Sequence, residues 1–287
     1  GLGIMIPPSV PLIIYATVAE ISVASVFLAA IGPGLCLAGA FCVYVAVIGD
    51  KVRDPEIAAR TVATRPKGRA LAKVLFRALP VVALPVLILG GIYSGLFTPG
   101  QAAAVAVAYA ATLSLTLYRD PDMPAMWRMV ADSGRLAAAI LLIMAATSVF
   151  GYIITQNRIP NEFATFMGHV GVTTLLFLLM VNGLLLLLGC FLEIISVILI
   201  TLPIFLPMLQ ELGIDPVHFA IIMILNMELA VITPPIGMNL FVISSISNTS
   251  IVQVFRGTLP FVAIMVAMLA LISMSEGFAL FSLRLLE

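Results

Sequence analysis

Two pairs of adjacent prolines interrupt long apolar stretches of the sequence, Pro7-Pro8 near its start and Pro234-Pro235 toward its end. A Pro-Pro pair lacks two backbone donors and clashes with the preceding turn, so a helix cannot continue through it. The backbone carbonyls and amides that lose their helical partners there are costly in hydrocarbon unless protein, water or an ion satisfies them. Freed carbonyl oxygens suit a small cation, and the helical N-terminus beyond each break favours an anionic group. The alternative is a pair of structural kinks, since proline is common in membrane helices.

Polar side chains beside the proline pairs could add oxygen ligands. Ser9 directly follows the first pair, and Thr233 directly precedes the second. Asn239, Ser244 and Ser245 lie shortly after the second pair. Because Ser and Thr in membrane helices often hydrogen-bond their own backbone, a purely local role stays open for each of them.

Two carboxylates also stand in apolar surroundings. An ionisable group at membrane depth is a functional candidate by default. Glu193 lies between two apolar runs, where it could neutralise a bound cation, be held by free amides, or reach water in a cavity. Glu228 follows Asn226 by two residues and therefore faces another side of the helix, so contact with a neighbouring helix is an equal alternative.

The composition indicates which solvent surrounds the protein. Hydrophobic residues make up 62% of the 287 positions and charged residues only 10%. A soluble domain carries about 25% charged residues, which it needs to cover its surface. We therefore expect an all-α polytopic protein whose outer surface faces lipid. The formal net charge is zero, so no basic surface indicates nucleic acid as a partner.

Other chemistries lack the residues that they need. Cys36, Cys42 and Cys190 form no CxxC pair, and none stands near a histidine at metal-ligand spacing. We interpret them as small buried residues, and His169 and His218 as interfacial side chains. No nucleotide-binding motif occurs, so we expect neither ATP as the driving force nor any cofactor.

A spanning helix needs about 20 mostly apolar residues. The segments that meet this condition, some of them broken by proline, are 1–30, 33–49, 79–96, 98–117, 136–155, 171–188, 194–209, 217–247 and 258–278. The segment 194–209 is short for a crossing. We therefore expect residues 171–209 to form a re-entrant helical hairpin with Glu193 at its tip.

A glycine-rich segment, 90–99, separates two of these spans. It has no strand before it and no Walker pattern, so it is not expected to cradle a phosphate. Thr98, Pro99 and Gln101 instead have the pattern of an N-cap, a first helical proline and the third position of a capping box.

Charge placement indicates the orientation in the membrane. The segment 50–77 holds eight basic residues against three acidic ones, which favours the cytoplasmic side. Counting crossings from there places 118–135 and Arg256 in the cytoplasm and makes the hairpin enter from outside. The first broken helix then runs outward and the second, 217–247, inward.

The surroundings of the two proline pairs resemble one another, with Met5–Ile14 matching Ile232–Phe241. Inverted repeats with interrupted helices at corresponding positions indicate a transporter's binding site. We therefore divide the chain into the end of a first repeat (1–49), a basic cytoplasmic connection (50–78) and a second repeat (79–287), whose last span is 258–278.

Four motifs, in family order and spread over essentially the whole chain, resemble the large permease subunit of TRAP (tripartite ATP-independent periplasmic) transporters. They are Gly3–Tyr15, Gly91–Pro99, Gly213–Phe219 and Thr233–Val242. One departure lies at the hairpin tip, where the family usually has Gly-x-Phe-Leu-Asp-Pro. The sequence here is Gly189-Cys190-Phe191-Leu192-Glu193-Ile194. The family also has a preceding stretch, and this chain begins at Gly1 inside an apolar run, so we expect a missing N-terminal part.

The resemblance implies a sodium-driven importer in the bacterial inner membrane. Its partners would be a small membrane subunit and a periplasmic solute-binding protein, which delivers an organic acid such as a C4-dicarboxylate or a sialic acid. It also implies an elevator-type mechanism, as in the ion transporter superfamily, in which hairpins and broken helices move together.

Two sodium sites follow as a hypothesis. The first would use oxygens around Gly3, Pro7, Pro8 and Ser9. The second would use those around Glu193, Thr233, Pro234, Pro235, Gly237 and Asn239. A helical N-terminus beyond each break would meet the substrate carboxylate.

Two other classes of protein are alternatives. A stand-alone sodium–dicarboxylate symporter of related architecture would take free substrate without a binding protein. A polytopic membrane enzyme would need a catalytic constellation, but no His–acid cluster or pair of aspartates lies in the membrane segments. We therefore expect no enzymatic activity.

Overall fold

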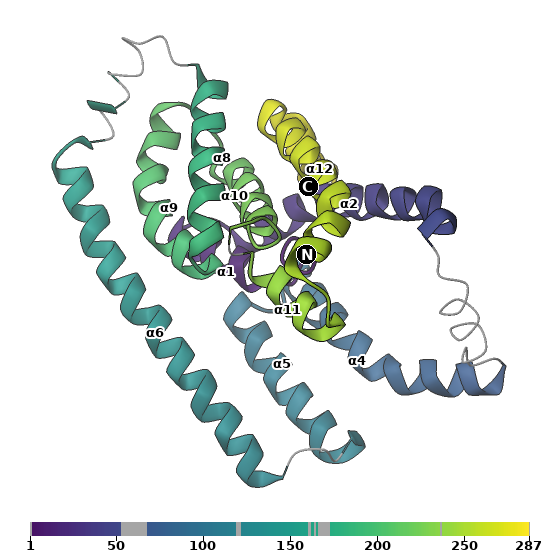
Figure 1. Cartoon of the computed structure of the whole chain (residues 1–287). Helices are drawn as coiled ribbons and strands as arrows, with labels where there is room; N and C mark the ends of the chain where they lie inside the picture. The colour runs from purple at the N-terminus through teal and green to yellow at the C-terminus, as the bar shows by residue number, and fades with distance from the viewer. Residues whose placement is uncertain are drawn as a thin grey trace. The chain divides into compact units, whose positions relative to one another are not determined.

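The computed structural model of the chain describes residues 2–52, 68–118, 122–159, 162–163, 165, 173–235 and 237–286. Every regular element in these ranges is a helix (Figure 1). Seven helices in this part of the chain are long and apolar enough to cross a membrane. The expectation of an all-α polytopic membrane protein is therefore confirmed.

The chain divides into two compact units, described separately below. The first comprises Gly1–Phe41 and Ala137–Glu287, and the second Cys42–Leu136. Helices α2 (Val23–Val52) and α6 (Met123–Gln156) each run from one unit into the other. The repeat boundaries at 1–49, 50–78 and 79–287 rest on sequence similarity and charge rather than on contacts, and they stay a prediction. Most of the basic connection, 50–78, lies outside the described residues.

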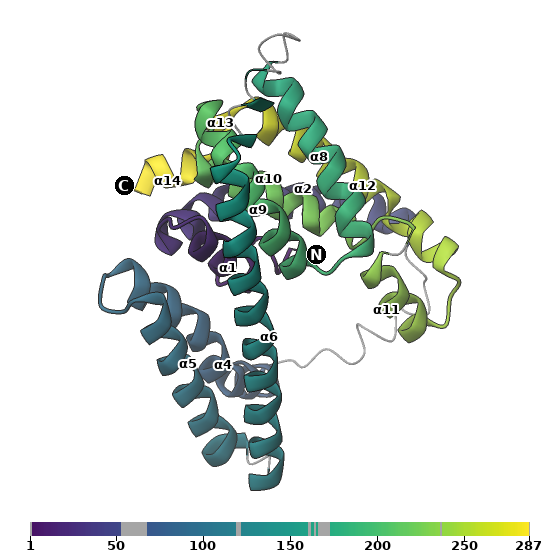
Figure 2. The same ribbon diagram turned by 90° about the vertical axis from the view of Figure 1, so that its left-hand side faces the viewer.

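The first unit is built around one buried helix. Its complete helices are α1 (Val10–Val18), α8 (Thr174–Phe191), α9 (Ile194–Glu211), α10 (Pro216–Ala230), α11 (Met238–Ser247), α12 (Ile251–Met274), α13 (Glu276–Ala279) and α14 (Phe281–Leu286). All residues of α10 from His218 to Ala230 are buried. A helix that is mostly apolar on all its faces belongs in the interior, and α10 carries only three polar residues there, His218, Asn226 and Glu228. Helices α1, α8 and α12 pack against it, and Figure 2 shows α8 and α12 beside α10.

His218 differs from its expected interfacial position. It is only 5% exposed, and its Nε2 lies 2.8 Å from the carbonyl oxygen of Ile272 in α12. The hydrogen bond satisfies a ring that the sequence places at the edge of an apolar segment. His169 lies outside the described residues.

Helix α2 is longer than the sequence indicates. It begins at Val23, after a left-handed turn at Glu20 (φ 57), and continues through Pro33. Because proline donates no hydrogen bond, the carbonyl of Ala29 loses its helical partner. The Ser282 hydroxyl lies 2.7 Å from the Leu28 carbonyl and 3.2 Å from that of Ala29. It also accepts a bond of 3.1 Å from the Gly32 amide, so α14 repairs the gap and the helix is not divided.

The second unit contains α4 (Arg69–Tyr93), α5 (Pro99–Leu113) and a short π-helical turn, Ser114–Tyr118. The Tyr109 hydroxyl donates to the Pro80 carbonyl at 2.9 Å, which joins α4 to α5. Thr98 and Gln101 form the predicted capping box at the start of α5.

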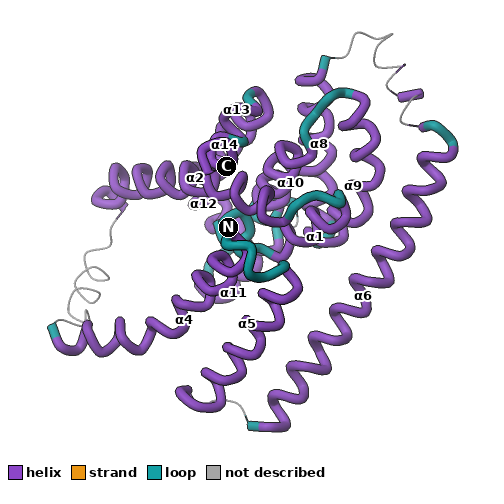
Figure 3. The backbone as a smooth tube through the Cα atoms, turned by 180° about the vertical axis from the view of Figure 1, so that it is seen from behind, coloured by secondary structure: helices purple, strands orange, loops and turns teal. Residues whose placement is uncertain are grey.

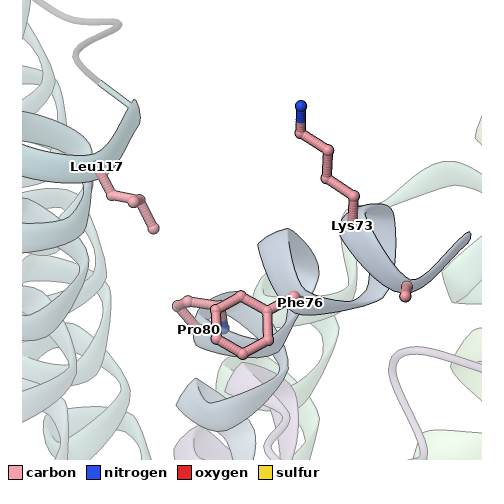
Figure 4. A pocket seen from close by; sticks show the side chains of 5 residues that line it. Lys73, Phe76, Pro80 and Leu117 are labelled. Atoms are coloured by element: carbon pink, nitrogen blue, oxygen red, sulfur yellow. The ribbon is translucent and has the colours of Figure 1, made fainter. Parts of the chain in front are cut away.

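Much of the α4 surface is apolar and exposed, and Phe76 is 80% exposed. An open pocket of about 520 Å³ lies between α4 and the π-helical turn (Figure 4). Its lining is Ala72, Lys73, Phe76, Pro80 and Leu117. Such a surface suits hydrocarbon, with the Lys73 ammonium free to extend toward water.

Candidate functional site

The first proline pair precedes a short helix. Residues 2–8 form turns and bends, and α1 begins only at Val10, as the sequence predicts. The Pro7-Pro8 peptide bond is cis. Ser9 occupies the N-cap position with extended backbone, and its buried hydroxyl donates to the Ile4 carbonyl. The segment before α1 is thus held by local bonds.

The second proline pair separates two helices. α10 ends at Ala230, and α11 begins at Met238. The Pro234-Pro235 peptide bond is also cis. The Asn239 amide donates across the break to the Val231 carbonyl at 3.0 Å. Figure 3 shows the non-helical segments in teal between the helices. The expected interruption of 217–247 is therefore present.

Gly237 is fitted to its place in this break. Its φ is +46°, a left-handed conformation that side chains disfavour. A Cβ atom built on it would lie 3.0 Å from the Thr233 carbonyl oxygen. The close approach of backbone to backbone therefore depends on glycine.

Helices α8 and α9 form a hairpin with a very short tip. Only Leu192 and Glu193 connect them, both with extended backbone. Glu193 is the N-cap of α9, where its Oε2 accepts a hydrogen bond of 3.2 Å from the Ser196 amide. The carboxylate is exposed. Of the uses expected for this residue, the structure shows the bond to a free amide.

The hairpin tip lies against the second break. A Cβ atom on Gly189 would approach the Ala230 Cβ to 2.7 Å, so the helices meet closely. The Cys190 sulfur lies 3.9, 3.8 and 3.7 Å from the carbonyl oxygens of Ala230, Thr233 and Pro234. A thiol is a single weak donor and cannot satisfy three carbonyls. These oxygens therefore retain capacity for another electropositive partner.

The predicted residues fall into two local groups. Pro7 and Ser9 are buried at the first break, whereas Gly3 is exposed. Pro234 and Pro235 are exposed at the second break. The Thr233 hydroxyl donates to the Leu229 carbonyl of its own helix at 2.7 Å, which is the local role that the sequence leaves open.

The two broken segments belong to the same compact unit and touch one another. α1 packs against both α9 and α10. The Tyr15 hydroxyl donates to the carbonyl of Pro216, the first residue of α10, at 2.7 Å.

The starts of α1 and α11 differ from those of most helices in the chain. Side chains cap α5, α8, α9, α10 and α12, through Thr98, Thr173, Glu193, Asp215 and Ser250. Neither Ser9 before α1 nor Gly237 before α11 makes a side-chain cap bond. First-turn amides that no side chain caps are suited to bind an anion.

Several contributors escape prediction from the sequence. The sequence indicates Cys190 only as a small buried residue, and no motif marks Asn182 or Ser273. Asn182 could have been noticed as an amide within an apolar span. Among the described residues, no group of three His, Cys, Asp or Glu side chains is placed to hold a metal ion. Any cation at the break would depend on carbonyl and hydroxyl oxygens.

Seven candidate spans in the described residues define a polytopic membrane protein, and two of its apolar segments are interrupted at proline pairs. The sequence model of one family, the tripartite ATP-independent periplasmic transporter, DctM component, matches residues 1–278. The chain belongs to this family.

Similar curated proteins carry several substrate names. A C4-dicarboxylate TRAP transporter large permease protein of Pseudomonas aeruginosa is 39% identical over 95% of this chain and 62% of its own length. A sialic acid permease protein of Vibrio cholerae is 34% identical over 97% of this chain and 64% of its own length. An ectoine/5-hydroxyectoine permease protein of Ruegeria pomeroyi is 30% identical over 98% of this chain and 64% of its own length.

Family membership places the chain among transport proteins rather than enzymes. It spans less than two thirds of the length of these three relatives. The names of these relatives give different substrates, so family membership identifies the class of protein but not its substrate.

Proposed function

We propose that this chain is part of the large permease subunit of a sodium-driven importer of an organic acid. The observation that carries the proposal is the convergence of three carbonyl oxygens of the second break on the hairpin tip. The Ala230 carbonyl already accepts a hydrogen bond of 3.1 Å from the Thr233 amide, whereas the Thr233 and Pro234 carbonyls face the weak Cys190 donor. Carbonyl oxygens at an interrupted helix favour a cation.

The second break supplies one proposed sodium site. Thr233 and Pro234 contribute carbonyl oxygens, and Gly237 allows the backbone to approach closely enough. Asn239 lies in the first turn of the helix beyond the break, and Pro235 prevents the helix from closing over the carbonyls. Glu193, at the adjoining tip, supplies negative charge.

The first break supplies the other proposed sodium site, around Gly3, Pro7, Pro8 and Ser9. This assignment rests on the matching proline pair and on the buried Ser9 hydroxyl. The uncapped starts of α1 and α11 are proposed to meet the substrate carboxylate. An organic acid suits these sites because each lies at the positive end of a helix dipole and has no side-chain cap.

The membrane arrangement is part of the proposal. The two proline-broken segments form an inverted repeat, and α8–α9 is a re-entrant hairpin that enters from the periplasmic side. The basic segment 50–77 faces the cytoplasm of a bacterial inner membrane. Hairpin and broken helices lie in one compact unit, which supports an elevator-type motion of that unit.

The family suggests the partners. A periplasmic binding protein would deliver the organic acid, and a small membrane subunit would accompany the permease. The main alternative is a symporter that needs no binding protein. The names of the relatives favour an acid or zwitterion of low mass over any single compound.

Uptake by proteoliposomes containing the assembled transporter tests this function. With binding protein and labelled organic acid present, uptake should require an inward sodium gradient and stop when potassium replaces sodium. Equal uptake under potassium would contradict the sodium assignment. Unchanged uptake without binding protein would favour the stand-alone symporter.

A further inference from the structure

Three buried polar side chains form a continuous chain of hydrogen bonds in the first unit. Asn226 donates through Nδ2 to the Asn182 Oδ1 at 2.8 Å, and Asn182 donates through Nδ2 to the Ser273 hydroxyl at 2.9 Å. Their exposed fractions are 0%, 6% and 5% in that order. The polar chain, meaning these three residues, joins α10, α8 and α12.

The polar chain lies close to the proposed cation site. Asn226 precedes Ala230 by one helical turn. Asn182 precedes Cys190 by two turns of α8, about 12 Å along the helix axis. The same two helices that the amides join therefore meet again where Cys190 faces the carbonyls of the break.

Apart from the close approach at Gly189, the other buried residues of α8 are apolar or weakly polar. They are Phe177, Leu178, Val181, Leu185 and Cys190. A slip of one residue moves a helix by about 1.5 Å along its axis and turns it by about 100°. Apolar side chains can repack after such a slip, whereas paired amides lose both bonds.

We propose that Asn182, Asn226 and Ser273 are positioning residues that fix the register of the hairpin arm α8 against the first half of the broken helix. They hold Cys190 and the tip against the carbonyls of the break without touching a ligand. The consequence for sodium binding rests on the function proposed above. A buried polar residue that sets helix register is well attested in other helical assemblies.

The polar chain is not arranged for greatest stability. Asn226 Nδ2 donates a second bond to the Ile222 carbonyl at 2.9 Å, but its Oδ1 has no hydrogen-bond partner among the described residues. A buried acceptor without a partner is destabilising, and apolar residues of similar size often replace such a group without loss. Stability alone therefore does not account for three polar groups at this place.

Because the polar chain is not expected to add stability, one experiment can distinguish a role in helix register from a role in stability. In the assembled transporter, the combined Asn182→Leu and Asn226→Leu substitution should leave the thermal midpoint equal to or above that of the unsubstituted protein. The sodium concentration for half-maximal uptake should rise roughly fivefold. Sodium binding must then supply the free energy that the interhelical hydrogen bonds contributed to the correct register. Alkylation of Cys190, followed by mass spectrometry of its peptide, should become faster.

Two controls accompany this variant. Ser273→Thr keeps the hydroxyl and should behave as the unsubstituted protein, whereas Ser273→Ala should shift sodium dependence and Cys190 alkylation in the same direction as the double variant. Thr201 is buried in α9 but donates only to the Val197 carbonyl of its own helix, at 2.7 Å. Thr201→Val should therefore leave both measurements unchanged.

The measurements also separate this inference from the proposed function. If the unsubstituted transporter takes up substrate without sodium, the proposed function fails, and Cys190 alkylation alone decides the positioning role. Unchanged alkylation in the double variant would overturn the inference. An equal shift in Thr201→Val would overturn it too, because any buried polar residue would then have the same effect.

Discussion

At the scale of single residues, the geometry of the second break depends on two properties of its backbone. These are the conformations that its residues can adopt and the closeness with which neighbouring backbones approach. Gly237 is left-handed and faces the Thr233 carbonyl, and Gly189 lets α8 come close to Ala230. Cys190 then faces three carbonyl oxygens. The absence of side-chain bulk at two positions is thus as important as the oxygen atoms themselves.

Substitution of Gly237 by alanine tests this dependence. The added Cβ is strained at φ +46° and crowds the Thr233 oxygen, so we expect a loss of about 1–2 kcal/mol in stability. Sodium-dependent uptake should fall at least tenfold, because the carbonyl moves. Thermal unfolding and uptake in proteoliposomes measure the two effects.

Gly257 in α12 provides the matched control. Nothing lies within 4 Å of a Cβ atom built on it, and its φ is not left-handed. Gly257→Ala should leave uptake unchanged and stabilise the helix slightly. Equal uptake by both variants would refute the importance of the Gly237 conformation.

The residue scale is also where prediction from sequence is weakest. Proline pairs were recognisable, because the missing amides have the same consequence in any helix. The partners of Cys190, Asn182 and Ser273 cannot be recognised in the sequence, because they lie on other helices. Contacts between distant segments depend on packing, which the composition of one segment does not specify.

At the scale of helices, local rules explain most boundaries. The capping box at Thr98 and the breaks at both proline pairs appear where expected. The hairpin arms, expected at 171–188 and 194–209, are Thr174–Phe191 and Ile194–Glu211. Three helices differ from expectation. α2 continues through Pro33, where Ser282, far along the chain, bonds to the carbonyls of Leu28 and Ala29. α4 and α6 begin at Arg69 and Met123 rather than at 79 and 136, because a helix can extend beyond its apolar part into polar residues.

Removal of the Ser282 hydroxyl tests this repair. Ser282→Ala leaves the Ala29 carbonyl and the Gly32 amide without that partner in a buried contact. We expect a loss of about 1–3 kcal/mol in stability, visible as a lower thermal midpoint in detergent. Ser247 is exposed and donates to the Ile243 carbonyl of its own helix, so Ser247→Ala should change little. Equal midpoints for the two variants would contradict a role of α14 in supporting α2.

At the scale of the whole molecule, composition correctly indicated a lipid-facing, all-helical chain, since a 10% charged content is insufficient to cover a soluble domain. The two compact units were not foreseen, because α2 and α6 run through both and no linker composition marks a boundary. The family match agrees with the motifs that carry the resemblance.

The central claim is that the carbonyl oxygens at the second break hold a dehydrated sodium ion beside the hairpin tip. Cys190 reports on that place, since its sulfur lies 3.7 Å from the Pro234 carbonyl oxygen. Alkylation of Cys190 in the assembled transporter should be compared in sodium, potassium and choline at equal ionic strength. The account predicts that sodium alone slows the reaction, in a saturable manner. The same rate in all three salts would contradict it.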